Sequence, residues 1–177
     1  ADALLRESEQ RLRLALKATR QGLIDIDVAT GAAVVSREYA ELHGQDPATF
    51  VETAEAWASR LHPDDRTRAV GAFAAYLAGK TDTYRTEVRQ QVGSEWRWIL
   101  THGEIAERHP DGTPKRFIGT ATDITDLKTA QLQAQSSAQL YAALSLCNEA
   151  IVRCRNESEL FPLICQAAVQ SGAATMA

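Results

Sequence analysis

The chain has 177 residues with a hydrophobic fraction of 45%, enough for one globular domain and a further element. Its net charge is −4, and its 19 basic residues are scattered, so the clustered basic stripe that binds a nucleic-acid backbone is missing. The sequence has no run of about 18 apolar residues and no signal-peptide core at its start. We therefore expect a cytoplasmic globular protein with no membrane span within this sequence and no nucleic-acid partner.

Residues 1–19 have the pattern of an amphipathic helix. Leu5, Leu12 and Leu16 recur at helical spacing among Arg, Glu and Gln residues. These leucines have no obvious partner within the same domain. We therefore expect a homodimer through the flanking helices, that is, this helix together with the one expected over residues 126–155.

A β-hairpin is expected after this helix. Ile24, Ile26 and Val28 alternate with aspartates, which is typical of a half-buried strand. Thr30 and Gly31 supply a tight turn, because glycine tolerates a positive φ, and the apolar run that follows is the return strand.

The alternation of apolar and polar residues is lost over residues 37–79. There we expect several short helices and then a longer one. Pro63, Asp64 and Asp65 suit the N-terminus of the longer helix, and Gly79 closes it.

Three more strands are expected after Lys80, where the period of two returns in the runs TYRTEVRQQV, EWRWILTHGEIAERH and KRFIGTATDIT. Trp96, Trp98 and Leu100 share one face of the middle strand. Turn residues between the runs indicate hairpins. The element order predicts an α+β fold, with a five-stranded antiparallel sheet and helices on one face.

The chain is expected to become helical again over residues 126–155, with Thr125 as the N-cap. A heptad repeat can be placed with its a and d positions at Leu127, Ala130, Ala134, Ser137, Tyr141, Leu144, Asn148 and Ile151. Its middle positions are small and weakly apolar, so the segment is either a marginal coiled coil or a helix packed on its own domain.

The order of the elements and the residues at their joints resemble a PAS domain of the subclass with a Trp-rich penultimate strand. The resemblance covers about residues 12–125 and rests on GLIDIDVATG, SREYAELHG, WASRLHPDDR, YRTEVR, EWRWI and DGTPKRFIGTATDIT. Residues from about 139 to 177 resemble the first helix and beginning of a GAF domain. The domains implied are an N-terminal helix (1–19), a PAS sensory domain (20–125), a helical linker (126–155) and a truncated GAF-like start (156–177).

The resemblance implies a sensing pocket between the sheet and the helices. The pocket candidates are Ile24, Ile26, Trp98, Leu100 and Phe117. Trp57, Trp96 and Trp98 could form an aromatic cage for a ligand, or they could simply pack in the core.

Asp123 and Thr125 match the terminal Asp-x-Thr of the family, which ties the last strand to the outgoing helix. A side chain that accepts a charge-assisted hydrogen bond beside a helix cap could convert a change in the sheet into a change of helix angle. The simpler alternative is that the pair only ends a strand and caps a helix.

The sequence does not identify a cofactor, but it bears on two classes, haem and flavin. The helix from Asp64 to Gly79, where haem-binding relatives place their ligand, contains no histidine, which argues against haem. A flavin photosensor needs a cysteine beside the flavin, and Cys147, Cys154 and Cys165 all lie beyond residue 125, so photoadduct chemistry is excluded. The cysteine spacing fits neither a zinc site nor a disulfide framework.

No catalytic motif is found: the sequence lacks a Gly-rich phosphate loop, an HExxH pair and a nucleophile elbow. This absence argues against an enzyme, and the PAS resemblance implies a non-catalytic regulatory module of a bacterial signalling protein, which senses a small ligand and acts on an output domain elsewhere in the protein. That output domain would be a cyclic-di-nucleotide synthase or hydrolase, or a histidine kinase. The alternative is a ligand-free dimerisation scaffold that only orients helices.

Overall fold

The computed structural model describes residues 2–153, so the GAF-like start predicted over 156–177 lies outside the described residues. The chain divides into two compact units, Ala1–Thr125 and Asp126–Ala177. The helices are α1 (Asp2–Thr19), α2 (Arg37–Leu42), α3 (Ala54–Arg60), α4 (Pro63–Leu77) and α5 (Thr125–Arg153). The strands are β1 (Gln21–Asp27), β2 (Ala33–Val35), β3 (Tyr84–Val92), β4 (Glu95–Arg108) and β5 (Pro114–Asp123).

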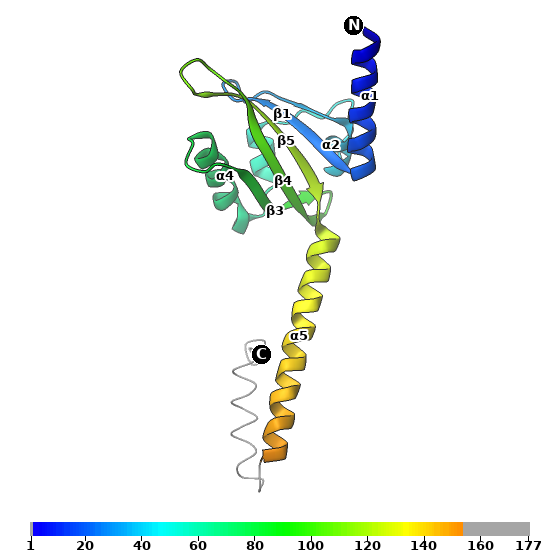
Figure 1. The fold of residues 1–177 in the computed structure, drawn as a ribbon, viewed down its shortest axis with the longest axis vertical. Helices are drawn as coiled ribbons and strands as arrows, with labels where there is room; N and C mark the ends of the chain where they lie inside the picture. The colour runs from blue at the N-terminus through cyan, green and yellow to red at the C-terminus, as the bar shows by residue number, and fades with distance from the viewer. Residues whose placement is uncertain (1, 154–177) are drawn as a thin grey trace. The chain divides into compact units, whose positions relative to one another are not determined.

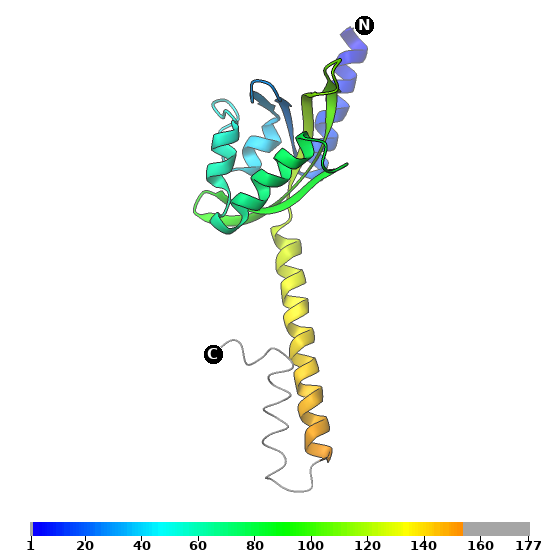
Figure 2. The same cartoon turned by 90° about the vertical axis from the view of Figure 1, so that its left-hand side faces the viewer.

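The five strands form one antiparallel sheet in the order β2-β1-β5-β4-β3 (Figure 1). Figure 2 shows α4 and the shorter helices lying over one face of this sheet. The α+β prediction of a five-stranded antiparallel sheet with helices on one face is confirmed.

Local capping explains where the short helices begin. The Ser36 hydroxyl accepts a hydrogen bond from the Tyr39 N–H at the start of α2 and another from the Leu23 N–H of β1. Thr53 caps α3 through the Ala56 N–H. The caps therefore fix α2 and α3 although both helices are too short to show a strong sequence period.

The inner face of the sheet carries the core in three clusters. Ile24, Tyr39, Ile99 and Ala121 form the first. The second is Leu61, Ala69 and Val88, and the third is Tyr76, Tyr84 and Phe117. Since each cluster joins a strand to residues from the covering segments, burial of apolar area holds the helices on the sheet.

A close approach of two strands requires paired glycines. Gly103 of β4 lies opposite Gly119 of β5, and the Phe117 ring covers both positions. A Cβ added at Gly103 would lie 2.3 Å from Phe117 Cζ and 2.6 Å from the Ile118 carbonyl oxygen. The absence of a side chain at Gly103 therefore makes the space that the buried Phe117 ring occupies.

The leucines of α1 differ in their environments. Leu16 is buried and α1 packs against β1, so the expectation that Leu16 lacks a partner in its own domain is wrong. Leu4, Leu12 and Leu14 are exposed. Dimerisation through α1 stays a prediction, and it can rest only on the exposed leucines.

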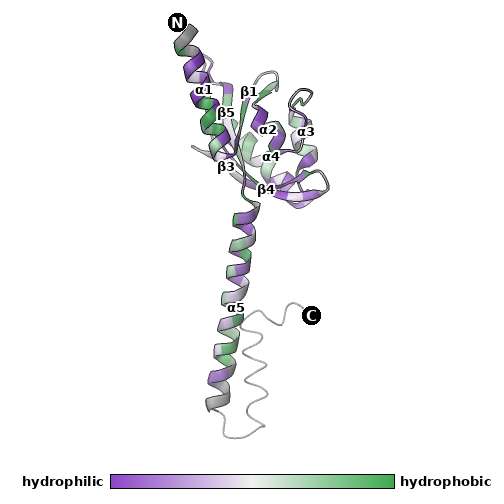
Figure 3. Ribbon diagram, turned by 90° about the vertical axis from the view of Figure 1, so that its right-hand side faces the viewer, coloured by the Kyte–Doolittle hydropathy of each residue, from purple (hydrophilic) through white to green (hydrophobic). Residues whose placement is uncertain are grey.

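In the second unit, α5 is one helix of 29 residues, and Figure 3 shows hydrophobic and hydrophilic residues mixed along it. The heptad residues Leu127, Tyr141 and Leu144 are exposed. Among residues 2–153, no helix has both the length and the hydropathy needed to cross a membrane.

Candidate functional site

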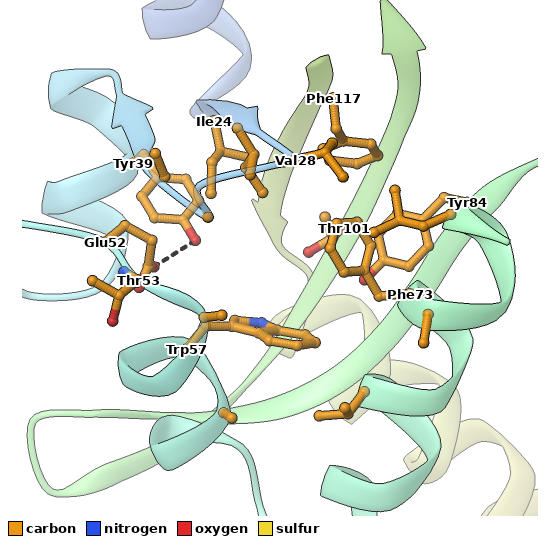
Figure 4. Close-up of a pocket in the computed structure, with 18 residues that line it drawn as sticks. Ile24, Val28, Tyr39, Glu52, Thr53, Trp57, Phe73, Tyr84, Thr101 and Phe117 are labelled. Carbon is orange, nitrogen blue, oxygen red and sulfur yellow. Dashed lines mark hydrogen bonds between the residues drawn. The ribbon is translucent and has the colours of Figure 1, made fainter. Parts of the chain in front are cut away.

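A cavity of about 330 Å³ lies between the inner face of the sheet and helices α3 and α4. Its walls are mainly aliphatic and aromatic, as Figure 4 shows. Strand, turn and helix residues all contribute to the lining, which consists of Ile24, Ile26, Val28, Gly31, Ala33, Tyr39, Glu52, Thr53, Ala54, Trp57, Ala58, Val70, Phe73, Ala74, Leu77, Tyr84, Thr101 and Phe117.

Three of the five predicted pocket residues line this cavity: Ile24, Ile26 and Phe117. Their contact with a ligand stays a prediction. Trp98 and Leu100 do not line the cavity, so their assignment to its wall was wrong. The reason is the phase of β4: Ile99 is fully buried on the inner face and Thr101 lines the cavity, which places Trp98 and Leu100 on the opposite face.

The three tryptophans do not form a common cage. Trp57 lines the cavity, whereas the Trp96 ring packs edge-on against His62, with 4.7 Å between ring centroids. The Arg89 guanidinium lies over the Trp98 ring, with 5.6 Å between Arg89 Cζ and the ring centroid. These three residues therefore do not form an aromatic cage. Trp96 and Trp98 instead make their contacts elsewhere in the domain.

The aromatic walls come mostly from residues that the sequence did not single out. Phe73 of α4 packs edge-to-face on Phe117, with 5.2 Å between centroids, and on Tyr84, with 5.1 Å. Phe73 lies in a helix of low amphipathicity, and no periodic pattern distinguishes it from a surface aromatic residue. Its role becomes visible only once α4 is packed on the sheet.

Glu52 is a buried carboxylate at the cavity wall, with 3% of its surface exposed. The Tyr39 hydroxyl donates to Glu52 Oε2 over 2.8 Å, the Thr53 N–H donates to Oε1 over 3.1 Å, and the Arg60 guanidinium forms an ion pair with Oε2. Burial, followed by the Glu52 charge, raises the pKa of Tyr39 well above its usual value. Tyr39 is therefore a stable donor to the carboxylate.

His43 lies behind this wall and is fully buried. Burial lowers the pKa of its imidazole, so the ring is neutral near pH 7. Its Nδ1–H donates to the Tyr39 carbonyl over 2.8 Å, and Nε2 lies 3.1 Å from Gln90 Oε1. Since Nε2 of this neutral tautomer can only accept, it is the Gln90 amide turned over, with its NH₂ group at this position, that would donate to the ring.

The predicted pair at the exit of the sheet is joined by hydrogen bonds. Asp123 Oδ1 accepts from the backbone N–H and the hydroxyl of Thr125, over 2.9 and 2.5 Å. The Thr125 Oγ1 accepts from the Trp98 N–H over 3.0 Å, and the Ile124 N–H donates to the Trp98 carbonyl over 2.8 Å. Thr125 is thus the first residue of α5 rather than its N-cap, and its N–H is bonded by the Asp123 side chain two residues earlier. Signal transmission by the pair stays a prediction.

The titratable side chains of the described part of the chain form no cluster that could hold a metal ion. The lining of the cavity contains no cysteine and no histidine. The side-chain groups that can direct a ligand there are one carboxylate, a few hydroxyls and the indole N–H of Trp57.

Comparison with known proteins identifies the fold independently. The family model described as the PAS fold matches residues 32–121. The chain resembles a sensory box histidine kinase/response regulator from Burkholderia thailandensis with 30% identity and a TM-score of 0.64, over 74% of this chain and 97% of that one.

Two other solved structures share the fold at lower identity. The N-terminal domain of a diguanylate cyclase with a PAS/PAC sensor from Marinobacter aquaeolei is 21% identical, with a TM-score of 0.52, over 59% of this chain and 95% of that one. An RNA-binding Light-Oxygen-Voltage receptor is 23% identical, with a TM-score of 0.53, over 74% of this chain and 36% of that one. No curated protein matches the chain. The family match and the similarity to the Burkholderia kinase together show that the chain belongs to the PAS-fold family of sensory signalling domains.

Proposed function

We propose that the PAS domain senses a small molecule in the cavity between its sheet and helices, and that α5 relays the occupied state to an output domain of the same protein. The observation that carries the proposal is the cavity itself. Its volume of about 330 Å³ falls within the range of roughly 300–1,000 Å³ that is typical of small-molecule sites, whereas packed interiors contain few voids larger than a water molecule.

The connection from cavity to exit supports a relay. Thr101 lines the cavity from β4, and Ile99, two residues before it, pairs with Asp123 at the end of β5. Trp98 of the same strand is hydrogen-bonded to Thr125. A ligand that shifts β4 at Thr101 would therefore act on Asp123 at the end of β5 and on Thr125 at the start of α5.

The output domain that we propose is a histidine kinase or a cyclic-di-nucleotide synthase or hydrolase. The similar structures that support this are parts of a histidine kinase/response regulator and of a diguanylate cyclase. We also propose that the module works as a homodimer through its flanking helices, because α1 and α5 both expose leucines. The Trp-rich subclass and a GAF-like domain after α5 remain part of this proposal.

The test is ligand binding by the purified chain. Native mass spectrometry is expected to detect a bound small molecule, or a metabolite panel to raise the melting temperature. Ala74→Leu, which places a larger side chain on the cavity wall, should weaken that binding about tenfold or more.

Ala78→Leu is the matched control, because Ala78 is exposed at the end of the same helix and does not line the cavity. If neither measurement detects a ligand and Ala74→Leu stabilises the protein, the ligand-free scaffold is the correct function.

A further inference from the structure

The cavity wall carries a single charged side chain, and its surroundings indicate the charge of the ligand. Glu52 is the only charged residue in the lining, and its carboxylate is already neutralised by Arg60. A ligand anion would face the carboxylate without a cation in the lining to balance it. A ligand cation would have to share that carboxylate with Arg60. Either ion would lose its hydration without full compensation, so the cavity favours a neutral molecule.

Glu52 still has room for one hydrogen bond. Its two oxygens accept from Tyr39, Thr53 and Arg60, and a carboxylate offers about four acceptor positions. A hydrogen bond to an ionised oxygen is stronger than one between neutral groups. A donor on the ligand is therefore the polar group that this wall selects.

The size and the walls of the cavity indicate ring systems. An apolar cavity of roughly 150 Å³ holds a benzene molecule, so the volume of about 330 Å³ suits a molecule of two fused rings. Figure 4 shows the Trp57 indole along one side of the cavity, with Phe73 and Phe117 on other parts of the wall. Aromatic walls of this kind pack well against planar rings, by stacking or edge-to-face contact.

We propose that the cavity binds a neutral, planar, two-ring molecule that carries a hydrogen-bond donor, and that Glu52 accepts this hydrogen bond. The proposal rests on the sensing function proposed above and adds the chemical class of the ligand. Phenolic and indole-like molecules belong to this class.

Four naphthalene probes of similar size test the proposal with the full 177-residue chain. Equilibrium dialysis, read by ultraviolet absorbance, compares 2-naphthol, naphthalene, 2-naphthoate and 2-naphthylmethylammonium near pH 7. We expect 2-naphthol to bind about tenfold more tightly than naphthalene, because the naphthol hydroxyl can donate to Glu52 and naphthalene has no donor. The anion and the cation should bind at least about tenfold more weakly than 2-naphthol.

Variants locate the binding without disturbing Glu52, whose replacement would leave Arg60 unpaired in a buried position. Ala74→Leu should weaken 2-naphthol binding about tenfold, and Ala78→Leu should leave it unchanged. Equal binding to both variants would overturn the proposal, because the probe would then be bound elsewhere.

The ligand panel separates this inference from the proposed function. If 2-naphthoate or the ammonium probe binds most tightly and Ala74→Leu weakens it, the neutral class is wrong while sensing in the cavity stands. If none of the four probes binds, the two-ring class is overturned, and the metabolite panel decides the sensing function independently.

Discussion

Asp65, in the first turn of α4, holds Arg89 of β3 through three hydrogen bonds. Its Oδ2 accepts from the Arg89 backbone N–H and from Nε, both over 2.9 Å, and its Oδ1 accepts from the guanidinium over 3.0 Å. These bonds to Arg89 lower the pKa of Asp65 to about 2. The pair fixes the start of a cavity-lining helix to an edge strand of the sheet.

The first prediction concerns this pair. Asp65→Asn should lower the free energy of unfolding at pH 7 by about 2 kcal/mol, because it removes the charge from a largely buried, hydrogen-bonded ion pair. Since the folded pKa lies below the ordinary value of 3.8, the stabilisation is present above pH 3.8 and is lost as the pH falls toward about 2. Urea unfolding of both proteins at a series of pH values measures this effect.

Asp64→Asn is the control for that measurement, because Asp64 is exposed and lies 3.4 Å from Arg89. It should change stability by no more than about 0.5 kcal/mol. A deficit of Asp65→Asn that does not shrink at low pH would show that the ion pair is not its cause.

The second prediction compares one substitution at two glycines. Gly103→Ala should destabilise the fold by about 3 kcal/mol, because the new Cβ would clash with the Phe117 ring and with the neighbouring backbone. Gly71→Ala, in the interior of α4 with open space around it, should stabilise by about 0.5–1 kcal/mol. Chemical denaturation of both variants gives the two signs, and a mild effect at Gly103 would contradict the packing described for Phe117.

The sequence predicted the fold well because alternation and turn residues report directly on strands. The period of two in β3 corresponds to buried Tyr84, Thr86 and Val88, as expected. On β4 the same alternation indicated two faces without saying which is inner, and the large residues Trp98 and Leu100 lie on the outer one. Residue size was a poor guide there, because the inner face of β4 carries Thr101 and Gly103, which leave room for the cavity and the Phe117 ring.

Glu52 shows why part of the site was beyond sequence reasoning. Its partners Tyr39 and Arg60 come from two different helices, α2 and α3. Acidic residues are normally exposed, and nothing in the local pattern distinguishes this one. A buried ion network of this kind is visible only after the tertiary contacts are known.

The third prediction follows from the buried ring of His43. Burial lowers its pKa below the ordinary 6.5, so protonation favours the unfolded chain. Stability is expected to be complete above pH 6.5 and to fall as the pH drops toward the lower folded pKa. Nitrogen-15 NMR should detect a neutral Nδ1–H tautomer at pH 7, and a charged ring at that pH would contradict the assignment.

The fourth prediction tests the proposed homodimer. Leu12→Lys should raise the monomer fraction in sedimentation at high protein concentration, because a charge on an exposed leucine of α1 would disfavour an apolar contact. Leu14→Lys is the matched control: Leu14 is equally exposed but lies two positions along the helix, on a different side. A monomeric parent protein, or an equal effect of both variants, would argue against a dimer through the Leu12 side of α1.

The last prediction separates relay from sensing. Asp123→Ala removes the acceptor of two hydrogen bonds from Thr125, so the N-terminal turn of α5 should open more often while the cavity keeps its lining. Hydrogen exchange should become faster in the first turn of α5, and the affinity for a cavity ligand should change less than twofold or so. Asp126→Ala, an exposed acidic residue within α5, controls for the loss of negative charge near the helix N-terminus. Loss of ligand affinity equal to the loss of helix protection would mean that Asp123 supports the whole domain, and the relay role would then be wrong.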